Sequence, residues 1–302
     1  MVILFYVTAI HQTKMNKIKR ISEFICVQVF DKMANFVAGD EMFTIQNPDV
    51  ERSVAALILT RKINFKKLPL KPGDRLEIVG DCICNDNIIF NIAKAVPFET
   101  NFKLADMNNW DEERLMNAAF MVKSQIVTSS HNGVGIGNCL IYEQFKPLDL
   151  VQQKFVRLIT PFECTNQWQI DQFTRTIDQI IGLGPGLTPS GDDFLIGFLS
   201  VIRFFSENSQ INHHLNRIEE RVESLLFKTT VVSKAFLSGA IDGQFAQSIC
   251  LYFEALDNED KTLQHRSLEK IAQHGSSSGV DTLNGILFGI KWIMGNLKQA
   301  NH

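Results

Sequence analysis

One ten-residue pattern occurs twice in this sequence. Residues 190–199 read SGDDFLIGFL and residues 278–287 read SGVDTLNGIL, so both fit S-G-x-D-x-L-x-G-x-L at a separation of 88 positions. Serine is favoured at a helix N-terminus because its hydroxyl accepts a bond from a free backbone amide. An acidic residue three positions later can bond back to the amide of that serine. The repeat therefore predicts two similar helix starts, each with its own capping box.

The stretch after each start is apolar on nearly every side, which is typical of a helix inside a core. Gly197 and Gly285 stand seven positions after the two serines. A glycine at such a place allows a neighbouring backbone to approach closely. We therefore expect both helices to be buried. The apolar residues concerned are Phe194, Leu195, Phe198, Leu199, Ile202, Leu283, Ile286, Leu287 and Ile290.

Glycine-rich or serine-rich segments precede both copies, GLGPGLTP before the first and HGSS before the second. A buried helix N-terminus presents unpaired N–H groups and the positive end of the helix dipole, so it attracts anions. Capping and a tight connection explain the same residues without a ligand, and both interpretations stay open. The ligand interpretation assigns binding roles to Gly184, Gly186, Thr188, Ser190, Gly191, Asp193, Ser277, Ser278, Gly279 and Asp281.

Asp192 has no acidic counterpart in the second copy, where Val280 aligns with it. Starting a helix therefore does not require Asp192, and we assign it a catalytic role as a candidate. A carboxylate repels a bare phosphate, so this role implies a ligand with N–H donors beside its anionic oxygens, or a bridging divalent cation. In the alternative interpretation Asp192 only favours the helix dipole, by about 0.3–1 kcal/mol.

Other candidate residues lie outside the two copies. His274 directly precedes the second copy and is a candidate hydrogen-bond donor or general acid; the alternative is a surface histidine. His131 and Asn132 begin a small-residue loop, HNGVGIGNC, that we expect to line the same cleft. Thr230 lies in TTVVSK, a candidate binding segment that could equally be a closely packed helix start.

Several classes of function are disfavoured. The net charge is −3 and there is no basic stripe, so we expect no nucleic-acid partner. The apolar runs are too short for a transmembrane helix. The six cysteines lack the paired spacing of a zinc site, so we predict no metal site and interpret them as reduced thiols of a cytoplasmic protein. There is no P-loop, since no lysine follows the glycine-rich segment.

The two parts of the chain differ in their patterns. From about residue 40 to 105 short aliphatic segments such as VAALILT, RLEIVG and NIIFNIA predict strands. Beyond residue 110 the spacing of Phe173, Ile177 and Ile180 predicts a helix that ends at the glycine-rich segment. A second helix is predicted from Leu215, Ile218, Val222 and Leu225, and residues 256–265 are expected to form an exposed loop.

These patterns predict an α+β protein. A small β-rich, barrel-like domain spans residues 1–105, and a larger, mainly helical domain with the glycine-rich motifs spans residues 110–302. Residues 1–14 are open to interpretation as an extension, because Met15 begins MNKIKR, a plausible start of its own.

Three motifs together carry a family resemblance: GLGPGLTPSGDDFLIG, TTVVSKAFLSGAIDGQF and HGSSSGVDTLNGIL. They resemble a bacterial family long filed under domains of unknown function, which includes the third subunit of the oxamate carbamoyltransferase complex of anaerobic allantoin breakdown, a step of purine degradation. The resemblance covers most of the chain from about residue 110 onward, and the β-rich part more loosely. It implies exchange of oxalurate and phosphate with oxamate and carbamoyl phosphate, in a hetero-complex with two other subunits.

The resulting expectation is a cytoplasmic subunit of a carbamoyltransferase-type complex that binds an anionic small molecule at paired helix N-termini. Phosphate or carbamoyl phosphate is the expected ligand, and no separate cofactor is predicted. The alternative is a metabolite-binding or assembly subunit without turnover of its own. The absence of a convincing nucleophile and base in the sequence favours that alternative.

Overall fold

The computed structural model describes residues 2–129, 135–137, 139–141, 148–163 and 170–300, with side chains to residue 295. The chain divides into two compact units, Met1–Thr100 and Asn101–His302. The first is a barrel-like sheet and the second is mainly helical, so the predicted α+β fold is confirmed.

Nine strands of the described chain form one sheet in the N-terminal unit. Their order is β5-β4-β3-β2-β6-β7-β8-β1-β9, and an additional pairing of β5 with β1 closes the sheet into a barrel. Closure leaves few unpaired strand edges. The strands are β1 (Ile3–His11), β2 (Glu23–Val29), β3 (Met33–Ala38), β4 (Glu41–Gln46), β5 (Ala56–Leu59), β6 (Arg75–Val79), β7 (Cys82–Cys84), β8 (Ile88–Asn91) and β9 (Val96–Phe98), with helix α1 (Gln12–Ile18) after β1.

Strand β1 completes the barrel. It pairs antiparallel with β5 and parallel with β8 and β9. Phe5 and Val7 point into the apolar core of the unit, while Leu4 and Tyr6 are exposed, as the alternation of a strand requires. Residues 3–11, which the sequence leaves open as an extension, are thus an integral part of the sheet.

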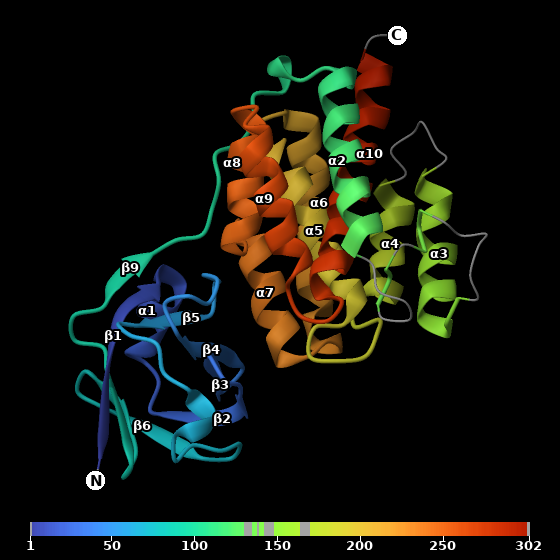
Figure 1. Ribbon diagram of the computed structural model, residues 1–302. Helices are drawn as coiled ribbons and strands as arrows, with labels where there is room; N and C mark the ends of the chain where they lie inside the picture. Colours follow the sequence, from blue (N-terminus) through green and yellow to red (C-terminus); the bar gives the residue numbers. More distant parts are fainter. Residues whose placement is uncertain (1, 130–134, 138, 142–147, 164–169, 301–302) are drawn as a thin grey trace. The chain divides into compact units, whose positions relative to one another are not determined.

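The helical unit is built around α5 (Ser190–Phe204) and α10 (Ser278–Ala300), which pack against each other (Figure 1). Helix α10 also contacts α2 and α9, and α5 contacts α4, α6 and α7. The other helices are α2 (Glu112–Ser129), α3 (Leu150–Glu163), α4 (Ile170–Ile180), α6 (Ser209–Leu225), α7 (Val231–Ile241), α8 (Gln247–Asp257) and α9 (Lys261–Ala272); short 3₁₀ turns lie at Phe65–Lys67, Met107–Asn109 and Leu226–Lys228.

The predicted burial of the two repeat helices is confirmed. The apolar residues named above on α5 and α10 have at most 4% of their surface exposed. Phe198 of α5 stacks on Trp292 of α10, and Phe173 of α4 packs against both rings. This aromatic cluster fixes the two helices against α4.

Helices α4 and α6 confirm the two helices predicted from apolar spacing. The predicted exposed loop at residues 256–265 is confirmed only for residues 258–260, because α8 extends to Asp257 and α9 begins at Lys261. The Asp260 carboxylate caps α9 by accepting from the Leu263 amide, and buried Gln264 donates to the Ala255 carbonyl. These two polar residues therefore stabilise the start of α9 and its contact with α8.

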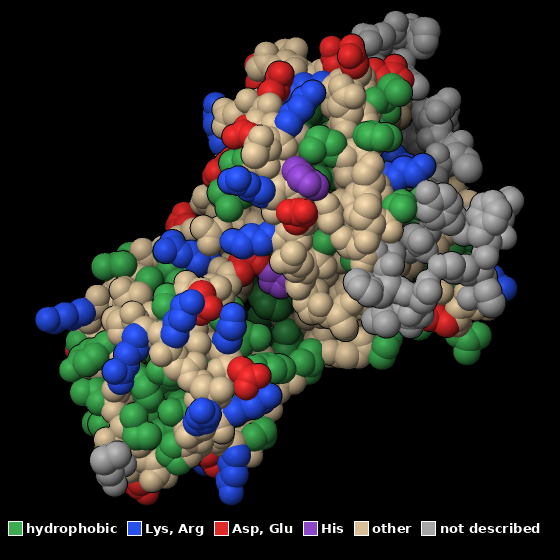
Figure 2. Space-filling model, viewed as in Figure 1, with side chains coloured by type: hydrophobic (Ala, Val, Ile, Leu, Met, Phe, Trp, Pro, Cys, Tyr) green, Lys and Arg blue, Asp and Glu red, His purple; other side chains and the backbone are tan. Residues whose placement is uncertain are grey.

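On the face drawn in Figure 2, Lys and Arg side chains are interspersed with Asp and Glu side chains. Among the residues that the structure describes, no helix has both the length and the apolar character needed to cross a membrane.

Candidate functional site

The two repeat helices begin side by side. A Cβ added to Gly197 would lie 2.0 Å from the Thr282 carbonyl oxygen, and a Cβ added to Gly285 would lie 2.0 Å from the Phe194 carbonyl oxygen. Each glycine thus faces the backbone of the other helix, at equivalent positions of the repeat. The two helices therefore pack against each other about two turns after their starts.

Side-chain hydrogen bonds connect the start of each repeat helix to the start of the other. Asp193 of α5 receives a hydrogen bond from Ser278 of α10, and Asp281 of α10 receives one from Ser190 of α5. The predicted capping box within the first copy is wrong, since the N-cap of α5 is Pro189 and lacks a side-chain cap bond. The serines and aspartates bond across the pair because the neighbouring start is within reach.

Asp192 is fully buried and ties together segments that are distant in sequence. Its Oδ1 accepts from the Gly182 amide at 2.8 Å, and its Oδ2 accepts from the Thr229 hydroxyl. Burial raises the pKa of Asp192, and the hydrogen bonds from Thr229, Gly182 and Ser233 oppose that shift. Asp192 therefore joins the loop before α5 to the start of α7.

Thr230 completes this junction. Its hydroxyl oxygen accepts from the Ser233 amide as the N-cap of α7, and its hydroxyl donates to the Leu187 carbonyl. The structure therefore brings TTVVSK beside the glycine-rich loop, residues 182–189. Thr229 and Ser233, which belong to the same candidate segment, also lie in this junction. Their signal in the sequence is a run of hydroxyl residues in an otherwise apolar helix start.

The glycine-rich loop needs two of its glycines for backbone conformation. Gly184 and Gly186 have φ values of +117° and +101°, which side chains rarely tolerate. Within the helix starts, the Gly191 amide donates to the Leu183 carbonyl and the Gly279 amide donates to the His274 carbonyl. These two predicted binding amides are therefore engaged inside the protein.

Thr188 and the serines before α10 flank the carboxylates. Thr188 donates a hydrogen bond to Asp193, and Ser277 donates one to Asp281. His274 is exposed, in the loop that leads into α10. All the site residues predicted in the two copies and their loops thus lie around one pair of helix starts.

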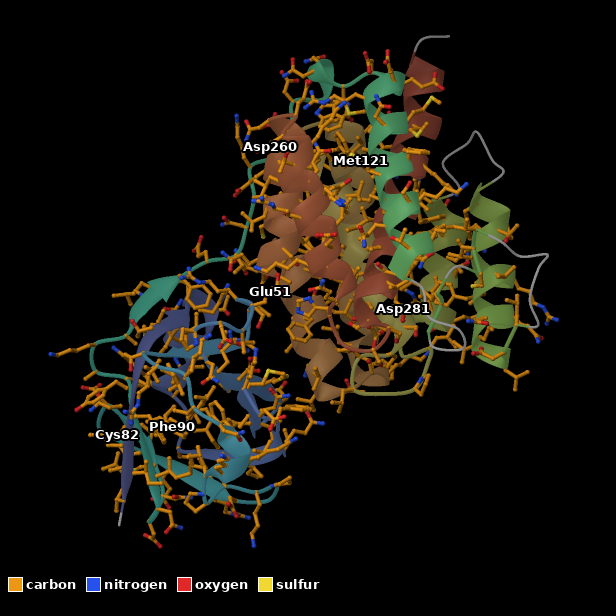
Figure 3. The ribbon with its side chains drawn as sticks, in the orientation of Figure 1. Glu51, Cys82, Phe90, Met121, Asp260 and Asp281 are labelled. Atoms are coloured by element: carbon orange, nitrogen blue, oxygen red, sulfur yellow. The ribbon has the colours of Figure 1, made fainter. Side chains whose placement is uncertain are left out.

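Residues 135–137 lie over the start of α10. The Ile136 amide donates to Asp281 Oδ1 at 2.7 Å, and Asn284 Nδ2 donates to the Gly137 carbonyl at 2.8 Å. Asn284 was not predicted; its signal is an amide in the apolar stretch DTLNGIL. His131 and Asn132, the residues predicted from this loop, lie outside the described residues. Figure 3 labels Asp281 at this end of α10.

Burial controls the charge of the carboxylates. It raises the pKa of Asp281 to about 7, against hydrogen bonds from Ser190, Ile136, Ser277 and Gly137 that lower it. The pKa of Asp193 is raised well above its ordinary range by burial and by the negative charge of Asp281. Two neighbouring buried carboxyl groups are expected to retain a proton at neutral pH.

The described residues hold no cluster of three acidic, histidine or cysteine side chains arranged to bind a metal ion. Several buried oxygens at the site have no hydrogen-bond partner among these residues. They are Asp193 Oδ2, Asp281 Oδ2 and Asn284 Oδ1. The site is thus rich in acceptor groups that a bound molecule could satisfy.

Fold and site together define an α+β protein in which two helix starts meet. Each start carries an aspartate and follows a segment that contains glycine. Residues 180–290 match the family described as oxamate carbamoyltransferase subunit AllH. The match covers all three motifs that carry the resemblance in the sequence, which is thereby confirmed. No solved structure showed a significant match to the chain.

Proposed function

We propose that this chain is the subunit of a carbamoyltransferase-type complex that binds a small anionic molecule at the starts of α5 and α10. The family match implies a role in the oxamate carbamoyltransferase complex. The observation that carries the proposal is the meeting of the buried residues Ser190, Asp193 and Asp281 with the half-buried Ser278. All four residues lie within the segment that matches the family.

Backbone amides of the glycine-rich loop are suited to the anionic end of the ligand. Among the described residues, no acceptor is found for the amides of Gly184, Gly186, Leu187 and Thr188. Gly186 and Leu187 are exposed, so a ligand can approach them. Amides at a helix entrance bind phosphate or carboxylate oxygens, and the dipole of α5 adds to the attraction.

The proposed reaction transfers a carbamoyl group from carbamoyl phosphate to oxamate. The oxamate nitrogen forms a bond to the carbamoyl carbon, the bond from that carbon to the phosphate oxygen breaks, phosphate leaves with the electron pair, and the nitrogen gives up a proton. The contribution of this chain is positioning and electrostatic stabilisation. His274, exposed beside α10, is the proposed proton donor or acceptor.

Asp192 takes a positioning role in this proposal. Both of its oxygens already accept bonds from the protein, so it acts on the ligand through the loop that it holds at Gly182 and through Thr229. This role refines the direct contact that the sequence suggests. The same proposal places the complex in the cytoplasm and in allantoin catabolism, with two other subunits as partners.

Reconstitution tests the proposal. The full chain, combined with its two partner subunits, should release phosphate from carbamoyl phosphate in the presence of oxamate, and omission of this chain should abolish the release. Asp192→Ala should lower the rate, with Asp171→Ala as the matched exposed control on α4. Equal rates for the wild type and Asp192→Ala would remove the assigned role of Asp192.

A second candidate function is a metabolite-binding or assembly subunit without turnover. The internal bonds of Asp192, Gly191 and Gly279 favour it, because these groups serve the fold before they serve any ligand. A thermal-shift measurement of the isolated chain with phosphate, oxamate or carbamoyl phosphate reports binding. Catalytic turnover by the isolated chain would eliminate this candidate.

A further inference from the structure

The unpartnered oxygens at the site are all able to accept hydrogen bonds. Asp193 Oδ2 and Asp281 Oδ2 lie on side chains with 4% and 0% of their surface exposed. A buried acceptor without a donor costs about 1–3 kcal/mol. The one proton that this carboxyl pair retains cannot satisfy every acceptor of the cluster, so a donor on a bound molecule would be stabilised here.

Asn284 gives independent support. Its Nδ2 donates to the carbonyls of Gly137 and Val280 at 2.8 and 2.9 Å, which fixes the orientation of the amide. Its Oδ1 is left without a partner, although only 1% of the residue is exposed. Asn284 follows Asp281 by almost one helical turn, so the two side chains lie on the same face of α10.

The backbone of Gly135 packs directly against this acceptor cluster. A Cβ added to Gly135 would lie 2.4 Å from Asp281 Oδ2, 2.7 Å from Oδ1 and 2.7 Å from the Ser277 Cβ. Only a residue without a side chain can therefore lie this close to the Asp281 carboxyl group. Gly135 also has a φ of +64°, so its conformation suits glycine.

We propose that Asp193, Asp281 and Asn284 accept the N–H bonds of a primary amide or carbamoyl group on the ligand and so determine specificity. This inference rests on the proposed function and divides the ligand between two sets of protein groups. The loop amides of Gly184, Gly186, Leu187 and Thr188 take the anionic end, and the acceptor cluster takes the uncharged N–H end. A hydroxyl or methyl group in place of the amide would leave acceptors unpaired.

The proton balance of the cluster supports this division. A carboxyl pair that retains one proton repels an anionic ligand less than two carboxylates would. The neutral carboxyl group can still accept N–H bonds at its carbonyl oxygen. An amide therefore binds there without requiring a compensating cation.

Oxamate and pyruvate provide the test, because they share a 2-oxo carboxylate frame and differ by NH₂ against CH₃. Calorimetric titration of the full chain, alone and in the reconstituted complex, should give at least tenfold tighter binding of oxamate. Asp193→Asn and Asp281→Asn should each reduce this preference to less than threefold, because the new carboxamide presents its own N–H donors. Asp171→Asn, an exposed site on α4, should retain the preference.

The wild-type comparison stands even if a variant fails to fold. Equal affinity for oxamate and pyruvate would overturn the N–H inference and leave anion binding at the loop intact. Failure of oxamate, pyruvate and inorganic phosphate to bind, both to the chain and to the complex, would overturn the proposed function as well. Stabilisation by Mg²⁺ alone, with no preference for oxamate, would identify the cluster as a cation site and also overturn the inference.

Discussion

Gly197 and Gly285 form a reciprocal pair, since each lies against the backbone of the helix that carries the other. The nearest backbone nitrogens to an added Cβ are Ile286 N, at 3.0 Å from Gly197, and Phe198 N, at 2.8 Å from Gly285. These partners are also equivalent positions of the repeat. The two helix starts are thus related by an approximate internal symmetry, which places Asp193 and Asp281 together.

This contact predicts a large effect of a single methyl group. Gly285→Ala should lower the free energy of unfolding by at least about 1–3 kcal/mol, because backbone atoms cannot move aside as a flexible side chain can. Gly295→Ala, in the same helix with no atom within 4 Å of the added Cβ, is the control. It should be neutral or stabilising by about 0.5–1 kcal/mol. Urea denaturation followed by far-UV circular dichroism measures both, and equal midpoints would refute the close packing.

Asp281 predicts how stability changes with pH. Burial raises its pKa to about 7, so the folded protein binds a proton that the unfolded chain has already released. The stability from this group is therefore fully present below the unfolded pKa of about 4, and it is lost as the pH rises to about 7. The slope is at most about 1.4 kcal/mol per pH unit.

Asp281→Asn should therefore flatten the decline in unfolding free energy between about pH 4 and 7. Asp171→Asn is the control, because the hydrogen bond from Arg217 lowers the pKa of Asp171 and gives its contribution the opposite sign. Urea titrations across this pH range measure the slopes. An unchanged slope in Asp281→Asn would show that Asp281 titrates near its ordinary pKa.

Lys14 and Glu41 make a corresponding prediction for the barrel. The Lys14 ammonium is buried, donates to Glu41 at 2.7 Å and lies over the Phe43 ring. Glu41→Gln should cost about 3–5 kcal/mol of stability, because it leaves a buried charge without its partner. Lys14→Met should cost less, since it removes the charge and leaves Glu41 paired with Lys17. Thermal denaturation of the two variants gives the order, and the reverse order would contradict the burial of the ammonium group.

The sequence predicted those parts of the fold in which local pattern and tertiary environment agree. The repeat predicted two buried helices with glycines at their contact, because an all-round apolar helix has no other stable place. Strands β1, β2 and β3 precede residue 40 and were not predicted individually. Strand β3 carries Asn35, buried in a hydrogen bond with Thr44 of β4, and this polar pair interrupts the apolar pattern of the strand.

The sequence predicted many residues of the site, but it did not predict which of them bond to one another. Ser190, Asp193, Ser278 and Asp281 were each predicted from helix-start chemistry, which acts within one helix. The hydrogen bonds between the two helix starts depend on the packing of two segments that lie 88 positions apart. The local sequence pattern carries no information on that packing. Asn284 and residues 135–137 were not connected to Asp281 for the same reason.

The glycine-rich loop allows backbone strain to be separated from ligand binding. Gly184 and Gly186 both have positive φ values, so alanine at either position should cost of order 1–3 kcal/mol of stability. Their surroundings differ, however. A Cβ on Gly184 would lie 2.9 Å from Ser190 N and 3.2 Å from Ser190 Oγ, whereas a Cβ on Gly186 would have no atom within 4 Å.

Gly184→Ala should therefore weaken binding of oxamate and phosphate at least tenfold beyond any effect of Gly186→Ala, because only the Gly184 methyl group displaces Ser190, which donates to Asp281. Thermal denaturation shows that the two variants share a similar strain cost, and calorimetric titration then compares their affinities. If both variants bind oxamate as tightly as the wild type, the start of α5 is a structural connection and the ligand lies elsewhere. If both lose affinity equally, the conformation of the loop determines binding and the contact of Gly184 with Ser190 does not.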